Sequence, residues 1–128
     1  MVDSGRNGSI VNISSHVSMR AFPGALGYNM AKSGVDMVTK QFALELGPHN
    51  IRVNSVNPTL TATNLKEELD ELADVEQHHV ERTPMGRINT IDDVVGPVLY
   101  LLSDFSAMVT GTNNLVDGGI SCNITIKQ

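Results

Sequence analysis

Two side chains that could exchange a proton stand four residues apart in the chain. Tyr28 and Lys32 occur in the stretch YNMAK, within a pattern of apolar residues at helical spacing. On a helix, residues four positions apart project from one face, so the phenol and the ammonium would share one space. A nearby ammonium stabilises the phenolate, which suits the phenol to acid–base catalysis. The same spacing also occurs on ordinary helix surfaces, so the pair alone leaves both interpretations open.

A serine at the end of a predicted strand supplies a third polar group. Residues 9–14, SIVNIS, form a short β-branched run, and Ser15 follows it directly. In open α/β sheets, ligands bind beyond the carboxyl ends of the strands. Ser15, Tyr28 and Lys32 could therefore converge at one end of the sheet. The alternative is that Ser15 only caps a turn, as serine often does.

The elements that must position these groups alternate along the chain. Short β-branched runs and apolar residues at helical spacing predict strands and helices in turn. The predicted elements are strands at 9–14, 51–56 and 112–116, helices at 26–46 and 91–102, and a charged helix or helix pair from 64 to about 82. Gly96-Pro97 is expected to make the helix at 91–102 irregular. This order predicts an α/β fold with a parallel sheet.

The composition and charge of the chain limit the kinds of partner that it is expected to bind. The chain has 128 residues, 41% of them hydrophobic and 18% charged, and a formal net charge of -5. An acidic chain does not suit a nucleic-acid groove or an anionic membrane surface, so a small-molecule partner is expected. The single cysteine, Cys122, cannot form an internal disulfide, and the sequence shows neither a signal peptide nor an apolar run long enough to span a membrane. We therefore expect a cytoplasmic protein.

The histidines are not expected to bind a metal. His16, His49 and the adjacent His78 and His79 do not form a recognised zinc spacing. Neighbouring residues on a helix point about 100° apart, which makes an adjacent pair poorly placed for one ion. We expect these side chains at the surface or in loops, and no metal site.

Four stretches together resemble the catalytic half of a short-chain dehydrogenase/reductase. They are IVNISS, YNMAK, LGPHNIRVNSVNP and LLSDFSAMVTGTNNLVDGG. Within that family, the sequence is most similar to the branch that reduces L-xylulose and small dicarbonyls. The resemblance covers nearly the whole chain, and it implies that residues 1–128 are the catalytic half of a single domain. The implied fold is part of a Rossmann-like, doubly wound parallel sheet without its N-terminal cofactor-binding half.

The resemblance also implies a role for each matching residue. Ser15 matches the serine that polarises the substrate carbonyl, Tyr28 the proton donor, and Lys32 its partner, which together with Tyr28 also holds the nicotinamide ribose. The implied cofactor is NADP(H). The positions matching the loop around the nicotinamide carboxamide are Asn57, Pro58, Thr59, Leu60, Thr61 and Thr63. The charged segment after Thr63 corresponds to a lid over the substrate.

The sequence also departs from the family pattern. It contains no Gly-rich turn between a strand and a helix, which would hold a pyrophosphate. The NNAG segment, the residue that selects the adenosine ribose and the upstream catalytic asparagine of the family are not found either. We therefore expect a partial sequence or a shortened isoform.

Two functions remain open. The first is an NADP(H)-dependent reductase of small dicarbonyls or ketoses, expected to be a homotetramer when complete. The alternative is a truncated, non-catalytic form that associates with the full-length oligomer through helix 26–46 and the C-terminal strand.

Overall fold

The chain folds around three parallel strands. The computed structural model describes residues 1–63 and 72–123. Its strands are β1 (Gly8–Ile13), β2 (Ile51–Pro58) and β3 (Asn113–Val116), and β2 lies between the other two. Both strand pairs are parallel. The predicted α/β fold with a parallel sheet is confirmed, although β1 begins and ends one residue earlier than predicted and β2 extends beyond its predicted end.

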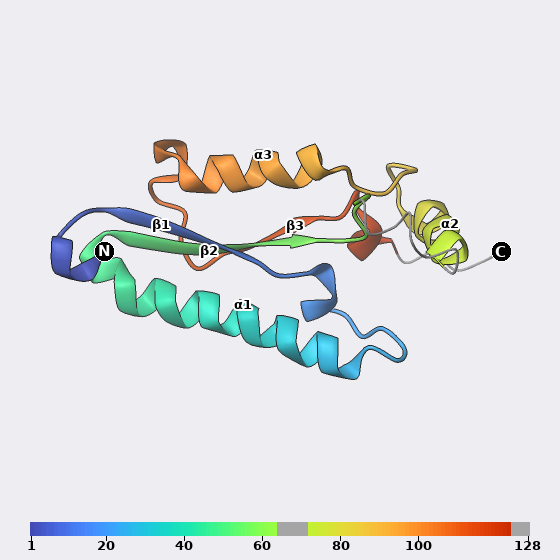
Figure 1. The fold of residues 1–128 in the computed structure, drawn as a ribbon, viewed down its shortest axis with the longest axis horizontal. Coiled ribbons are helices and arrows are strands. Elements are labelled where there is room, and N and C mark those ends of the chain that lie inside the picture. Colours follow the sequence, from blue (N-terminus) through green and yellow to red (C-terminus); the bar gives the residue numbers. More distant parts are fainter. Residues whose placement is uncertain (64–71, 124–128) are drawn as a thin grey trace.

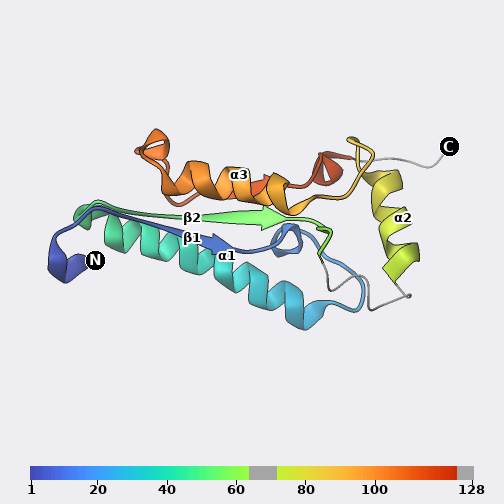
Figure 2. The same ribbon diagram turned by 45° about the horizontal axis from the view of Figure 1, so that its top comes forward.

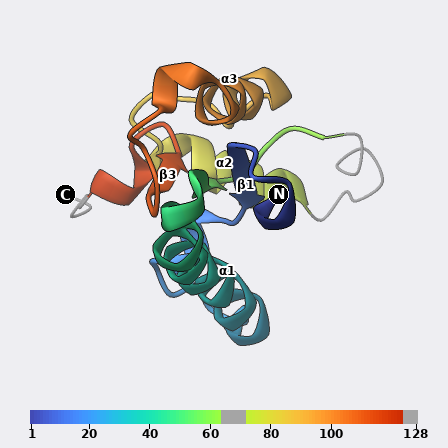
Figure 3. The same ribbon diagram turned by 90° about the vertical axis from the view of Figure 1, so that its left-hand side faces the viewer.

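Helices cover both faces of the sheet. α1 (Leu26–Leu46) lies against one face and α3 (Ile91–Leu102) against the other, as Figures 1 and 2 show. The end-on view in Figure 3 shows the same helix–sheet–helix layers. α2 (Leu72–Arg82) lies beyond the carboxyl end of β2. Parallel strands are normally buried between helices in this way, and the arrangement is the doubly wound one that was predicted.

The two long helices have their predicted limits, but one expectation about them is wrong. α3 continues through Gly96 and Pro97 without a break, although irregularity was expected there. Its first turn is held by a capping box, in which Thr90 and Asp93 exchange hydrogen bonds. Arg87 pairs with the same carboxylate at 2.6 Å and helps to hold the pKa of Asp93 well below its usual range. The capping box and the Arg87 pair thus fix the start of α3.

α2 forms the last part of the predicted charged segment, and residues 64–71 of that segment lie outside the described residues. Within the described part of the chain, none of the helices combines the length and apolarity needed to cross a membrane.

β2 forms the centre of the molecule. Ile51 and Val53 pack with Ala43 of α1, with Ile10 and Leu46 at the edge of this cluster. Side chains alternate along a strand, so Ser55 and Asn57 follow on the same face toward α1. The face is therefore apolar near the start of β2 and polar near its end, where both side chains approach Asp36 of α1.

β1 forms one edge of the sheet, and proline explains where it ends. The Ser14 N–H donates to the Val56 carbonyl at 2.8 Å. In a parallel ladder, the Ser14 carbonyl would next accept from the N–H of residue 58. That residue is Pro58, which has no N–H, so pairing stops there. β2 itself continues to Pro58 because it still pairs with β3, which corrects the predicted strand end at residue 56.

Candidate active site

Ser15 lies where β1 ends and a short helical turn begins. This turn, η2 (His16–Ser18), has Ser15 as its N-cap residue, and the serine hydroxyl accepts from the Val17 N–H at 3.4 Å. The hydroxyl also lies 3.4 Å from the Pro58 carbonyl. Ser15 therefore does cap a turn. Both contacts are long for hydrogen bonds, so the hydroxyl is only weakly held by the protein.

Lys32 and Tyr28 lie on one face of α1, beside the end of β1. The Lys32 ammonium donates to the Ile13 carbonyl at 3.0 Å, and its Nζ lies 5.6 Å from the centre of the Tyr28 ring. The Ser14 hydroxyl donates back to the Lys32 carbonyl at 3.1 Å. These bonds tie α1 to Ile13, the last residue of β1, and to Ser14, which follows it. The structure thus places Lys32 beside Ile13, two residues before Ser15 in the chain, with the exposed Tyr28 side chain next to the lysine.

A buried network supports this end of the sheet. The Asn57 amide nitrogen lies 3.0 Å from both carboxylate oxygens of Asp36 and 3.2 Å from the Ser15 carbonyl. It also lies 3.0 Å from the Ser18 hydroxyl, while the Asn57 oxygen accepts from Ser55 at 2.7 Å. Asn57 is fully buried. Its side chain therefore links α1 to the turn that carries Ser15.

Asp36 was not among the predicted site residues, although the sequence held a signal for it. It continues the four-residue row of Tyr28 and Lys32 along α1. A carboxylate on the side of a helix that packs against a sheet is expected to find buried donors. Asn57 supplies them, but only the fold shows that the two residues meet.

The chain after β2 continues beyond the carboxyl end of the sheet. The Thr59 N–H donates to the Val116 carbonyl at 3.1 Å, whereas the buried Thr59 hydroxyl has no partner within the described residues. Thr61 forms a parallel bridge with Asn89. Leu60 and Thr61 are half-buried, and Thr63 is exposed. Of the predicted cofactor positions, Asn57 and Pro58 thus belong to the strand and the others to the segment that follows it.

One expectation about the histidines is wrong. His79 on α2 is only 8% exposed, and its Nδ1 lies 2.9 Å from the Val75 carbonyl. His16 is half-buried, and its ring meets that of His79 edge-on with 6.3 Å between the ring centres. α2 folds over the turn after β1, which buries both side chains at the carboxyl end of the sheet. Sequence reasoning missed this contact because the two residues are distant in the chain.

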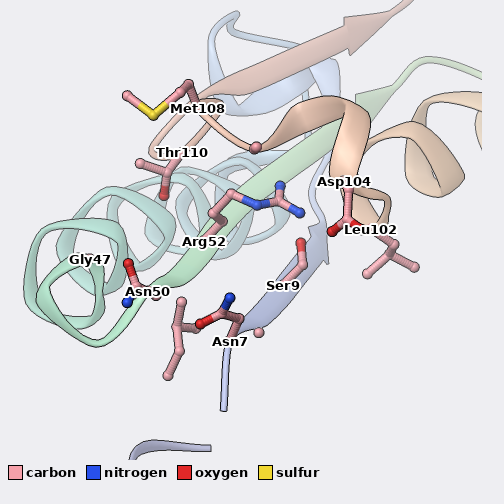
Figure 4. A pocket seen from close by; sticks show the side chains of 12 residues that line it. Asn7, Ser9, Gly47, Asn50, Arg52, Leu102, Asp104, Met108 and Thr110 are labelled. Carbon is pink, nitrogen blue, oxygen red and sulfur yellow. The ribbon is translucent and has the colours of Figure 1, made fainter. Parts of the chain in front are cut away.

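A cavity at the opposite end of the sheet is not lined by Ser15, Tyr28 or Lys32. It has a volume of about 430 Å³ and lies near Gly8 and Ile51, where β1 and β2 begin. Figure 4 shows Arg52 and Thr110 among the side chains that line it. The Arg52 guanidinium donates to the Leu101 and Ser103 carbonyls and to the Ser106 hydroxyl. Its donors thus serve the fold rather than a ligand.

The geometry defines a Rossmann-like α/β protein with a serine, a tyrosine and a lysine at the carboxyl end of its sheet. A family model described as Enoyl-(Acyl carrier protein) reductase matches residues 1–121. The chain belongs to the short-chain dehydrogenase/reductase family, as its motifs predicted.

Curated relatives include carbonyl reductase [NADPH] 2 of Sus scrofa, which is 44% identical over 119 residues. L-xylulose reductase of Homo sapiens is 41% identical over 119 residues. Each match covers 93% of this chain and 49% of the relative. The chain therefore spans about half the length of the curated relatives it matches.

Solved structures of dehydrogenases and reductases are also similar to this chain. A gluconate 5-dehydrogenase from Burkholderia cenocepacia, determined with NADP and tartrate, superposes with a TM-score of 0.88 at 31% identity. The match covers 96% of this chain and 48% of the other. A short-chain type dehydrogenase/reductase from Mycobacterium ulcerans also has a TM-score of 0.88, at 36% identity over 96% of this chain and 44% of the other.

Proposed function

We propose that residues 1–128 are the catalytic half of a single domain that reduces the carbonyl group of small dicarbonyls or ketoses with NADP(H). One observation carries the proposal. The Lys32 ammonium donates to the Ile13 carbonyl at the end of β1, 5.6 Å from the centre of the Tyr28 ring, and Ser15 follows Ile13 by two residues. The ammonium and the phenol thus lie near the end of β1, and the Ser15 hydroxyl that follows makes only two long hydrogen bonds, each of 3.4 Å.

Each of the three side chains has a distinct role in this proposal. The Ser15 hydroxyl donates a hydrogen bond to the substrate carbonyl oxygen and so polarises the carbonyl. Tyr28 then delivers a proton to that oxygen. The Lys32 ammonium stabilises the phenolate that Tyr28 becomes, because an opposite charge nearby favours the ionised form. General acid catalysis of this kind contributes about 10²–10⁴-fold to a rate.

Residues of this chain fit the nicotinamide end of the cofactor, which supplies a hydride when it is bound. Among the described residues the buried Thr59 hydroxyl has no partner, as expected of a group that awaits a ligand. Tyr28 and Lys32 would hold the ribose, and the segment Asn57–Thr61 with Thr63 would meet the carboxamide. The names of the carbonyl reductase and gluconate 5-dehydrogenase relatives support NADP(H) as the cofactor.

The relatives' names also support the substrate class. Curated relatives at 41–44% identity are named carbonyl reductase and L-xylulose reductase. A cytoplasmic location and a homotetramer for the complete protein remain predictions from the sequence and the family resemblance.

The proposal is tested by replacing each tyrosine in the full-length protein that carries this chain. Tyr28→Phe is expected to lower the rate of diacetyl or L-xylulose reduction by about 10²–10⁴-fold, because the proton donor is lost. Tyr100→Phe on α3 is the matched control, since Tyr100 is similarly exposed, and it should retain the rate. NADPH binding, followed by nicotinamide fluorescence, should persist in both. A Tyr28→Phe rate within about tenfold of the wild type would contradict the proton-donor role.

A second candidate function is association of a truncated, non-catalytic form with the full-length oligomer. The open edge of β1 favours it, because an unpaired edge is a template for another strand. Exposed apolar residues of α1, including Met30 and Leu44, offer further surface. Native mass spectrometry of the 128-residue chain mixed with the full-length protein tests this function, and separate species at all ratios would exclude it.

A further inference from the structure

A small pocket adjoins the candidate active site on the side of α2. It has a volume of about 90 Å³, roughly the space of three water molecules. Its walls come from the turn after β1, from α2 and from η6 (Ile120–Cys122), which follows β3. Figure 1 shows α2 beyond the carboxyl end of the sheet, where this turn and η6 also lie. The first pocket residue, His16, follows Ser15 directly in the chain.

Two arginines give this pocket a positive charge. Arg20 and Arg82 both line it, and within the described residues neither guanidinium has a hydrogen bond or an ion pair. The chain as a whole carries a net charge of -5, so two unpaired cations at one small pocket are unusual for it. A guanidinium binds carboxylate in a two-pronged geometry that no other side chain matches.

The nearby acidic group does not neutralise these cations. The Asp117 carboxylate is largely buried and accepts from the N–H groups of Gly119 and Ser121 at 2.9 and 3.1 Å. Burial alone would raise the pKa of Asp117, but the hydrogen bonds from these backbone N–H groups lower it below its ordinary value. The Asp117 carboxylate is thus hydrogen-bonded by the backbone of its own loop and not by either arginine.

The two histidines supply a different kind of group. His79 Nδ1 bonds to a carbonyl and must carry the hydrogen, which leaves its Nε2 for another partner. His16 Nδ1 is buried and has no partner within the described residues. Burial lowers the pKa of His16 below its ordinary value of 6.5, so the ring is neutral at pH 7 and one nitrogen can accept a hydrogen bond. Hydroxyl groups are suitable donors to such nitrogens.

From these donors and acceptors we propose that the pocket binds a carboxylate and a neighbouring hydroxyl of the substrate. Arg20 and Arg82 bind the carboxylate, and the Nε2 atom of His79 accepts the single hydrogen of the hydroxyl. The inference rests on the proposed carbonyl reduction and narrows its substrate class. Hydroxylated oxo acids, such as keto sugar acids, are preferred over neutral ketoses of similar size.

The first test measures binding without any reaction. Tartrate is titrated calorimetrically into the full-length protein that carries this chain, with succinate and threitol as probes that lack the hydroxyls or the charge. Arg20→Gln and Arg82→Gln are expected to weaken tartrate binding about tenfold or more, since each removes a charge-assisted hydrogen bond. Arg6→Gln is the matched control, because Arg6 is exposed and outside the pocket, and it should leave the affinity unchanged.

The outcomes of the binding test are distinct. Succinate and threitol should each bind more weakly than tartrate. No binding of tartrate, equal losses in Arg6→Gln and Arg82→Gln, or tighter binding of inorganic phosphate than of tartrate would each overturn the proposal. Arg82→Lys should retain part of the affinity because it keeps the charge, and the melting temperature of each variant shows that it is folded.

The second test separates this inference from the proposed function. Reduction of a keto sugar acid and of L-xylulose is compared in the wild type and in Arg82→Gln. The KM for the acid should rise about tenfold or more while the KM for L-xylulose stays the same. If no carbonyl compound is reduced but tartrate binds and Arg82→Gln weakens that binding, the proposed function is wrong and the carboxylate-binding role of the pocket is supported. If L-xylulose is reduced and the acid shows no response to Arg82→Gln, the pocket fails and the function stands.

Discussion

β1 and β2 lie side by side in register, yet they differ sharply in burial. Val53 and Val56 of β2 are completely buried, whereas Ile13 at the end of β1 is 50% exposed. Both strands are short β-branched runs with an asparagine and a serine. The difference arises because β2 has a strand on either side and β1 on one side only. Position in the sheet, rather than strand composition, explains this difference in burial.

One asparagine on each strand shows the same difference in burial. Asn57 of β2 donates to the Asp36 carboxylate at 3.0 Å and is fully buried. Asn12 of β1 donates to the Thr39 hydroxyl at 2.9 Å and is only half-buried. Both bonds join a strand to α1. The first satisfies a buried charge, and the second joins two neutral groups near an edge.

The largest expected effect comes from removing each asparagine in turn. Asn57→Leu should destabilise the fold by about 3–5 kcal/mol, because the Asp36 carboxylate stays buried with only the long contact from the Ser55 hydroxyl. Asn12→Leu should cost only about 1 kcal/mol, the net value of an ordinary hydrogen bond. Urea unfolding of the two variants measures both changes in the free energy of unfolding.

The double variant Asn57→Leu/Asp36→Leu serves as the control for this prediction. Removing both partners leaves no buried carboxylate without its amide donor, although the Ser55 hydroxyl loses its acceptors, so the loss should be smaller than the sum of the two single losses. Equal losses in Asn57→Leu and Asn12→Leu would break the comparison between the strands.

A smaller difference, in the rate of amide hydrogen exchange, is expected between neighbouring residues of β1. Gly8 and Ser14 bond toward β2, so the N–H groups of Val11 and Ile13 point to the open edge. In the 128-residue chain their amide hydrogens should exchange about tenfold or more faster than those of Ile10 and Asn12, which face β2. Hydrogen exchange followed by NMR measures this ratio. Equal protection would mean that another strand pairs with the edge.

The smallest effect concerns pH at the end of β1. Burial lowers the pKa of His16 in the folded state, so below 6.5 the unfolded chain binds more protons than the folded one. The contribution of His16 to stability is therefore complete above pH 6.5 and is lost as the pH falls below that value. Thermal unfolding between pH 5 and 8 should show a shallower decline in His16→Gln than in the wild type. His49→Gln on the exposed turn after α1 is the control and should match the wild type.

Much of the fold could be predicted because its signals are local. The helical spacing from Leu26 to Leu46 and the Gly-Pro that follows predicted α1 to the residue. The end of β2 was missed, because its pairing with β3 involves residues far along the chain. The burial of His79 was missed for the same reason, since it depends on where α2 packs.

The sequence by itself determined the family, the order of strands and helices, and the face that Tyr28 and Lys32 share, because these depend on motifs and on spacing within one element. The tertiary structure decided what those side chains meet. Only the packing of α1 against β1 and β2 brings Lys32 to the Ile13 carbonyl and Asp36 to Asn57. Only the fold brings α2 over the turn after Ser15 and so forms the pocket between Arg20 and Arg82. Contacts between distant segments depend on packing of the whole chain, which no local pattern encodes.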